Sequence, residues 1–228
     1  MFAADAAEIT QFKVDPFEKA GRPVFSEVAK RYAELVRRMP WEHMACTVTL
    51  PDHGVLTVGD AVRRLGLDAA VPHASGEGEP EDLGLQQVGV GVVTWSNNPY
   101  PDGKELTDRL GGAGFRHWYL AVDIEGNTTL YARYGDNDGQ LQFPEPEWMP
   151  FIPWTEQIGP LAPYAEMFAA VYDTWSGEPE TWTDNPEVSV VGTCLAVIEL
   201  ESGVRLDKEM SRGPLKGAAV AVRGRPLG

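Results

Sequence analysis

Cysteine is scarce in this sequence, and we expect neither a secretion signal nor a membrane span. The 228 residues include two cysteines, Cys46 and Cys194, which are too few for a disulfide framework in a chain of this length. The first residues, MFAADAAEITQFK, lack the cationic start and apolar core of a signal peptide. All apolar runs fall far short of the ~18 residues that cross a bilayer. These absences predict a cytoplasmic protein with no membrane partner.

Known catalytic motifs are also missing. The sequence has no Gly-x-Ser-x-Gly, no P-loop, no dinucleotide-binding glycine pattern and no kinase motif set. Cys46 and Cys194 stand in apolar stretches predicted to be strands, where buried free cysteine is common. His117 has aromatic neighbours and is expected to be a half-buried packing residue. We therefore assign no catalytic residue, although a pocket that joined a cysteine to a histidine would favour an enzyme.

Two short stretches contain metal-ligand residue types without a complete site. His43 and Cys46 form half of a zinc pattern, and no second pair matches them. Asp136 and Asp138 could begin a calcium loop, but Leu141 occupies the position where glycine is needed. We expect a polar turn at residues 135–139, and neither a metal nor another cofactor.

Charge of one sign dominates the chain. The sequence has 34 acidic and 19 basic residues, a net charge of −15 and a pI of about 4.6. This charge repels nucleic acid and favours a basic protein partner. Residues 203–228, the basic tail, reverse the sign with six basic and two acidic side chains. The tail has two interpretations: an ordinary solvated terminus, or a segment that pairs with the acidic body, within one chain or between copies of a homo-oligomer.

Hydrophobic periodicity predicts a single α+β domain over residues 1–228, with a mostly antiparallel sheet and two to four helices packed on it. Predicted helices cover 23–39, the stretch TVGDAVRRLGL with its Thr57–Asp60 capping box, 105–110 and 163–175. Predicted strands cover 45–50, 86–95, the hairpin 115–134, the central strand 187–200 and a last short strand at 218–223. Residues 72–84 are expected to be a mobile acidic loop.

Residues 46–150 resemble families of uncharacterised actinobacterial proteins. The shared features are CTVTL, AVRRLG, a valine-rich strand, HWYLAVDIEGN and a loop that begins FPEP. Some of these families are suspected to be immunity or partner-binding proteins. The resemblance therefore implies a partner-binding role and transfers no catalytic residue.

The proline-rich segment, residues 143–163, is the most unusual part of the sequence. Its six prolines exclude a central strand or a helix interior, yet it carries eight large apolar side chains. One interpretation is a loop that covers the core. The other is an exposed binding surface, because proline limits the entropy lost on binding and large apolar residues dominate interface energetics. The candidate binding residues are Glu145, Glu147, Trp148, Met149, Phe151, Trp154 and Glu156.

Three hypotheses for function remain open. The first is a non-enzymatic binding module, an inhibitor or immunity-type partner of a basic protein, in which acidic residues steer the encounter and tryptophans anchor it. The second is a structural subunit of a homo-oligomer or phage-like assembly, joined through the basic tail. The third is an enzyme whose site is assembled from scattered residues.

Overall fold

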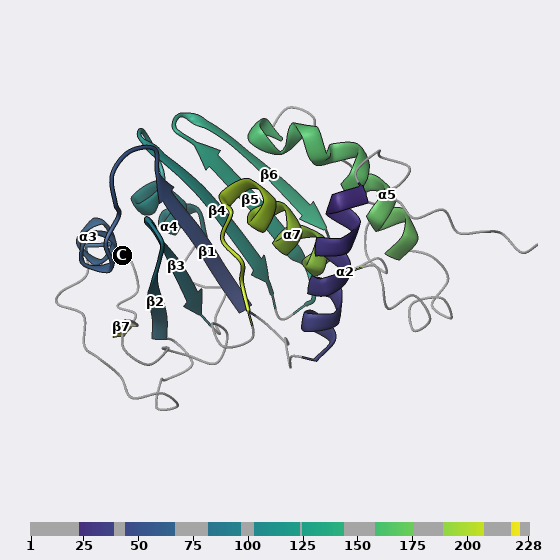
Figure 1. Cartoon of the computed structure of the whole chain (residues 1–228), viewed down its shortest axis with the longest axis horizontal. Coiled ribbons are helices and arrows are strands. Elements are labelled where there is room, and N and C mark those ends of the chain that lie inside the picture. Colours follow the sequence, from purple (N-terminus) through teal and green to yellow (C-terminus); the bar gives the residue numbers. More distant parts are fainter. Residues whose placement is uncertain are drawn as a thin grey trace, which may run out of the picture.

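A seven-stranded antiparallel sheet with helices on both faces forms the part of the chain that the computed structural model describes (Figure 1). The described residues are 23–38, 44–66, 82–96, 103–123, 125–143, 158–175, 189–207 and 220–223. The helices are α2 (Pro23–Arg37), α3 (Val58–Arg64), α4 (Gly103–Leu110), the 3-10 helix η1 (Gly159–Tyr164), α5 (Ala165–Trp175) and α7 (Val190–Ser202). The strands are β1 (Met44–Pro51), β2 (Asp82–Val88), β3 (Gly91–Ser96), β4 (Phe115–Val122), β5 (Thr128–Tyr134), β6 (Asn137–Phe143) and β7 (Val220–Arg223). The predicted fold class, α+β with a mostly antiparallel sheet, is confirmed.

The strands follow the order β6-β5-β4-β1-β3-β2-β7, with β1 in the middle and β7 at one edge. The predicted hairpin forms from β4 and β5, whose register pairs Trp118 with Ala132. The next turn, at Gly135 and Asp136, joins β5 to β6 by two residues, since Tyr134 lies opposite Asn137. The stretch 135–139 is therefore a hairpin turn and the start of a strand, as expected for a polar turn.

Residues 187–200 were predicted to form a central strand, and this prediction is wrong because residues 190–200 belong to helix α7. Ser189 caps the helix by accepting a hydrogen bond from the Gly192 amide at 3.0 Å. Gly203 ends it in the left-handed region at φ 71°. A segment that is buried on every side has no periodicity to separate a helix from a strand. Cys194 consequently lies in a helix and not in a strand.

Helix α7 lies on one face of the sheet together with α2 and α5, and we name this the α7 face (Figure 1). It contacts α2, α5, β1, β4 and β5. The contact with α2 is close, because a Cβ on Gly192 would lie 2.8 Å from the backbone nitrogen of Ala33. Glycine at this position thus allows the two helices to cross at short range.

Helices α3 and α4 cover the opposite face of the sheet, where their apolar residues join a second core cluster. Their C-terminal ends bind each other through arginine. The Arg64 guanidinium donates to the carbonyl oxygens of Leu110 and Gly111, at 3.3 and 2.8 Å. Arg109 donates in turn to the carbonyl oxygen of Leu65. Each arginine satisfies terminal carbonyls that an isolated helix leaves without a partner.

Residues 86–95 were predicted to be one strand, but they form a hairpin. Gly89 and Val90 make its turn, with Gly89 at φ 54°. Close packing occurs at Gly91, where a Cβ would lie 2.3 Å from the Thr49 carbonyl oxygen. The two glycines of this valine-rich stretch therefore have different roles: Gly89 lies in the turn and Gly91 contacts β1.

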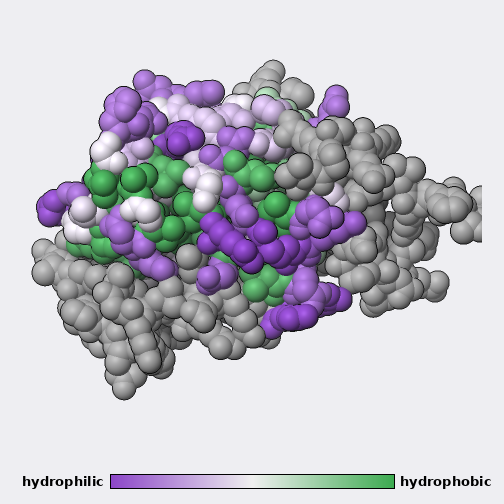
Figure 2. All heavy atoms as spheres, in the orientation of Figure 1, coloured by the Kyte–Doolittle hydropathy of each residue, from purple (hydrophilic) through white to green (hydrophobic). Residues whose placement is uncertain are grey.

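The α7 face is mixed in polarity (Figure 2). Hydrophobic residues lie over the region of β1 and β3, and hydrophilic residues lie over α2. The exposed large apolar side chains of the described residues are Val55, Val90 and Leu200. Val55 and Val90 are near each other because the Leu56 amide donates to the Val90 carbonyl oxygen. Two valines make too small a patch to define a binding surface.

Among the described helices, none has the length and apolar character to cross a membrane.

Candidate functional site

All seven candidate binding residues of the proline-rich segment lie outside the described residues, in the range 144–157. The two ends of the segment are described. Phe143 ends β6, and Ile158 and Leu161 lie beside or in η1; all three are buried in the core of the α7 face. At both ends the segment therefore fills the core, while the interpretation of Trp148 and Trp154 remains a prediction.

The outer edge of β2 is the clearest binding geometry in the described structure. It pairs antiparallel with β7, which comes from the basic tail. The register matches residues of compatible character: Asp82 lies opposite Arg223, Leu83 opposite Val222, and Leu85 opposite Val220. Strand β7, which belongs to the basic tail, thus pairs with the sheet within one chain.

Strand β2 is fixed by contacts that do not involve β7. On its inner side it pairs with β3 from Gly84 to Val88, and Leu83 and Leu85 are buried. The Gln87 side-chain amide donates to the carbonyl oxygens of Leu56 and Gly91, at 3.0 and 2.8 Å. The edge of β2 therefore has a defined position that other parts of the sheet maintain.

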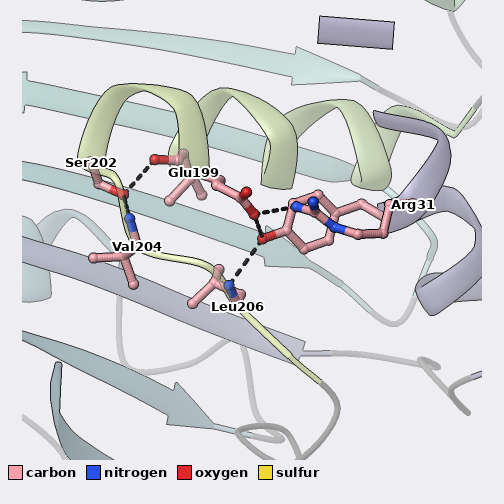
Figure 3. Close-up of polar contacts among 7 residues, drawn as sticks. Arg31, Glu199, Ser202, Val204 and Leu206 are labelled. Carbon is pink, nitrogen blue, oxygen red and sulfur yellow. Dashed lines mark hydrogen bonds and ion pairs between the residues drawn. The ribbon is translucent and has the colours of Figure 1, made fainter. Parts of the chain in front are cut away.

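The Glu199 carboxylate meets a guanidinium and a phenol near the C-terminal end of α7 (Figure 3). Glu199 accepts hydrogen bonds from the Arg31 guanidinium and from the Tyr32 hydroxyl. The same hydroxyl accepts a hydrogen bond from the buried Leu206 amide at 2.9 Å. Burial, and then the hydrogen bond to Glu199, raise the pKa of Tyr32, so the phenol stays protonated. These bonds join α2, α7 and the first residues of the basic tail.

A second carboxylate, that of Glu201, connects α7 to β5 and η1. Glu201 accepts hydrogen bonds from Tyr134 on β5, at 3.2 Å, and from Tyr164 of η1. The Tyr134 hydroxyl also accepts from the Trp118 indole nitrogen at 3.1 Å. Burial, and then the charge of Glu201, raise the pKa of Tyr134. Both glutamates therefore hold α7 to its neighbours. These hydrogen bonds give both residues a structural role that involves no catalytic reaction.

His117 is completely buried, whereas the sequence predicted a half-buried residue. Its Nδ1 lies 2.7 Å from the Thr49 hydroxyl, and its Nε2 has no hydrogen-bond partner in the structure. Burial, with smaller contributions from the positive charges of Arg133 and Arg64, lowers the pKa of His117 to about 3. The imidazole is therefore neutral at ordinary pH, and it packs on the α3–α4 side of the sheet.

The two cysteines are free and buried, and they lie on the other side of the sheet from His117. Cys46 and Cys194 belong to the core of the α7 face, whereas His117 pairs with Thr49, whose side chain alternates with that of Cys46 along β1. Burial raises the pKa of Cys46 to about 12. The sheet thus separates both thiols from this imidazole, and the pair that would favour a cysteine enzyme is not formed by these residues.

Within the described ranges, no group of three or more His, Cys, Asp or Glu side chains is placed to hold a metal ion. The apparent calcium loop contains Asp138, whose carboxylate accepts a hydrogen bond from Tyr131. Comparisons with known proteins give no match to a family model, a curated protein or a solved structure.

The sequence did not predict the neighbour of the last strand or the partners of the glutamates of α7, for two different reasons. Residues 218–223 were expected to form a strand, but no feature of the sequence named β2 as its neighbour. The one available signal was the match between LGL and VAV, with acidic and basic residues at equivalent ends. Glu199 stands in the segment that was predicted to be a strand and Glu201 directly follows it, so their partners on α2, β5 and η1 could not be derived.

Proposed function

We propose that the chain is a protein-binding module, an inhibitor or immunity-type partner of a basic protein. The observation that carries this proposal is the pairing of the acidic body with its own basic tail, in which Arg223 lies opposite Asp82. The net charge of −15 supports it, because an acidic surface attracts a basic partner and speeds encounter. Two free, buried cysteines are compatible with a reducing cytoplasm, where we place the protein.

The module acts by occlusion and needs no chemical step. Trp148 and Trp154 anchor the complex, because large aromatic side chains contribute most to interface energetics. The remaining contacts come from a polar, acidic rim and two further apolar residues: Glu145, Glu147, Glu156, Met149 and Phe151. Charge steering of this kind acts on the association rate and weakens with salt.

The experiment is a pull-down of the tagged chain from a lysate of the source organism, at low and at high salt, with intact-mass analysis of the eluate. A stoichiometric basic protein that is lost at high salt supports the proposal and identifies the partner. Recovery of the chain alone, in fixed multiples, contradicts it and favours the homo-oligomer. Recovery of a bare monomer also contradicts it.

The double variant Trp148→Ala/Trp154→Ala locates the interface. It is expected to abolish capture of the partner and to keep the wild-type circular dichroism and urea midpoint. The matched control is Val55→Ala/Val90→Ala, which removes two exposed apolar side chains from another part of the surface. If the tryptophan variant unfolds, the segment covers the core and the anchoring role is wrong.

A further inference from the structure

We infer that the outer edge of β2 is the docking site for an extended basic strand of the partner, and that β7 occupies this site in the free chain. This inference rests on the proposed function and adds the place of binding and the form of the bound segment. Adding a strand to a sheet edge is a common way to recognise peptides, because the main chain supplies affinity and the register supplies specificity.

The arrangement of β7 supports its replacement. Among the described strands it pairs with β2 alone, over four residues, at the edge of the sheet. A short terminal edge strand opens at a small fraction of the free energy of global unfolding. Once β7 leaves, β2 presents unpaired backbone donors and acceptors, which readily accept another strand.

The body of the protein is built to remain when β7 leaves. Leu83 and Leu85 stay in the core of the α3–α4 side, and the pairing with β3 continues along β2. The Gln87 amide holds the end of the strand to the β1–α3 loop. The open edge is therefore preorganised, which lowers the entropy lost when a new strand binds.

The register of β2 and β7 indicates which residues a replacing strand needs. Val220 and Val222 lie opposite two leucines, and Arg223 lies opposite Asp82. A replacing strand thus needs the pattern apolar-small-apolar-basic, antiparallel to β2. A basic protein offers the charged end of this pattern more often than an acidic one.

Because β7 is tethered, it competes with any free strand. A tethered segment acts at an effective concentration of roughly millimolar, so the occupied edge reduces the apparent affinity for a peptide. We expect a peptide to bind a chain with a released β7 at least about tenfold more tightly than it binds the wild type.

The test uses full-length chains and a fluorescent peptide of residues 217–225, GAAVAVRGR, with fluorescence anisotropy as the readout. The releasing variant is Ala221→Pro/Val222→Pro. Successive amides of a strand point to opposite sides, so one of the two prolines must remove a hydrogen-bond donor to β2. Tighter binding to this variant than to the wild type supports the inference, and equal binding, or none, overturns it.

A second variant keeps the inference testable if the prolines unfold the chain. Gly84 lies opposite Ala221, and a Cβ at Gly84 would lie at an ordinary 3.6 Å from the Trp95 carbonyl oxygen. Gly84→Cys/Ala221→Cys therefore allows β7 to be locked by a disulfide. The oxidised chain is expected to lose peptide binding, and reduction is expected to restore it. Unchanged binding on locking overturns the inference.

Charge reversal tests the register. Asp82→Arg is expected to weaken binding of the wild-type peptide several-fold, and a peptide with Arg223→Glu is expected to recover the loss on that chain. No recovery contradicts the proposed pairing of Asp82 with a basic residue.

The two proposals fail in different ways. If the partner is captured equally by the wild type and by the proline variant, the binding function stands and the β2 docking site is wrong. If the peptide binds the released edge but no basic protein is captured from the lysate, the docking site stands and the proposed function is wrong.

Discussion

The buried imidazole of His117 predicts a loss of stability in mild acid. The side chain is neutral in the folded protein, because burial and the nearby Arg133 and Arg64 lower its pKa to about 3. In the unfolded chain a histidine titrates at a pKa of about 6.5. Between these two values the unfolded state binds one more proton than the folded state, so the free energy of unfolding falls as the pH falls.

The size of the effect follows from the two pKa values. Each pH unit between them changes the free energy of unfolding by about 1.4 kcal/mol. From pH 8 to pH 5 the expected loss from this one side chain is about 2 kcal/mol, since titration of the unfolded state begins near pH 6.5. That is a large part of the roughly 5–15 kcal/mol by which a domain is stable.

The assay is urea unfolding, followed by tryptophan fluorescence, at several pH values between 8 and 5. The comparison is between the wild type and His117→Asn, because asparagine keeps a polar group within reach of the Thr49 hydroxyl and takes up no proton. The wild type is expected to lose about 2 kcal/mol more than the variant over this range.

An exposed histidine supplies the matched control. His53 lies in the exposed stretch after β1, and His53→Asn makes the same substitution at this exposed position. The comparison of variants is needed because many carboxylates of this acidic chain also titrate as the pH approaches 5. Parallel curves for the wild type and His117→Asn would show that the buried imidazole does not lower the free energy of unfolding in acid.

Two further substitutions test the packing of α7. Gly192→Ala is expected to destabilise the fold by about 1–3 kcal/mol in urea unfolding, although alanine favours a helix, because its Cβ would collide with the backbone of α2. Tyr32→Phe is expected to cost about 1–3 kcal/mol in the same assay, because it leaves the buried Leu206 amide without its acceptor and removes a donor to Glu199.

Matched substitutions separate these causes from general effects. In α3, a Cβ on Gly59 would have no neighbour closer than 3.8 Å, so Gly59→Ala is expected to be neutral or stabilising by up to about 1 kcal/mol. Tyr131→Phe removes a hydroxyl that bonds exposed Asp138, and its cost is expected to be below about 1 kcal/mol. If Gly192→Ala behaves like Gly59→Ala, the close crossing of α2 and α7 is wrong.

The sequence was sufficient where local signals decide the structure. Thr57 and Asp60 gave the start of α3, and the full capping box is present. The alternation in residues 115–134 correctly predicted the β4–β5 hairpin. These features depend on neighbours in the chain, so a single sequence contains the information.

The sequence was insufficient where a segment is apolar on all sides. Residues 190–198 of α7 are almost wholly buried between the sheet and α2, so neither a period of two nor one of 3.6 residues could appear in them. The terminal signals, Ser189 and Gly203, were present and pointed to a helix. For such segments, capping residues and glycines at the ends deserve more weight than internal hydrophobicity.

The cluster around Tyr32 also fixes the first residues of the basic tail. The Leu206 amide is fixed by the Tyr32 hydroxyl, and Val204 and Leu206 are buried, so the chain remains part of the core up to this point. Beyond it, residues 208–219 connect this fixed point to β7 at the edge of the sheet. Exchange of β7 at β2 therefore requires no change in α7 or α2. If Tyr32→Phe weakens this fixed point, peptide binding at β2 should be unaffected while the fold loses stability, which separates the docking edge from the structural core.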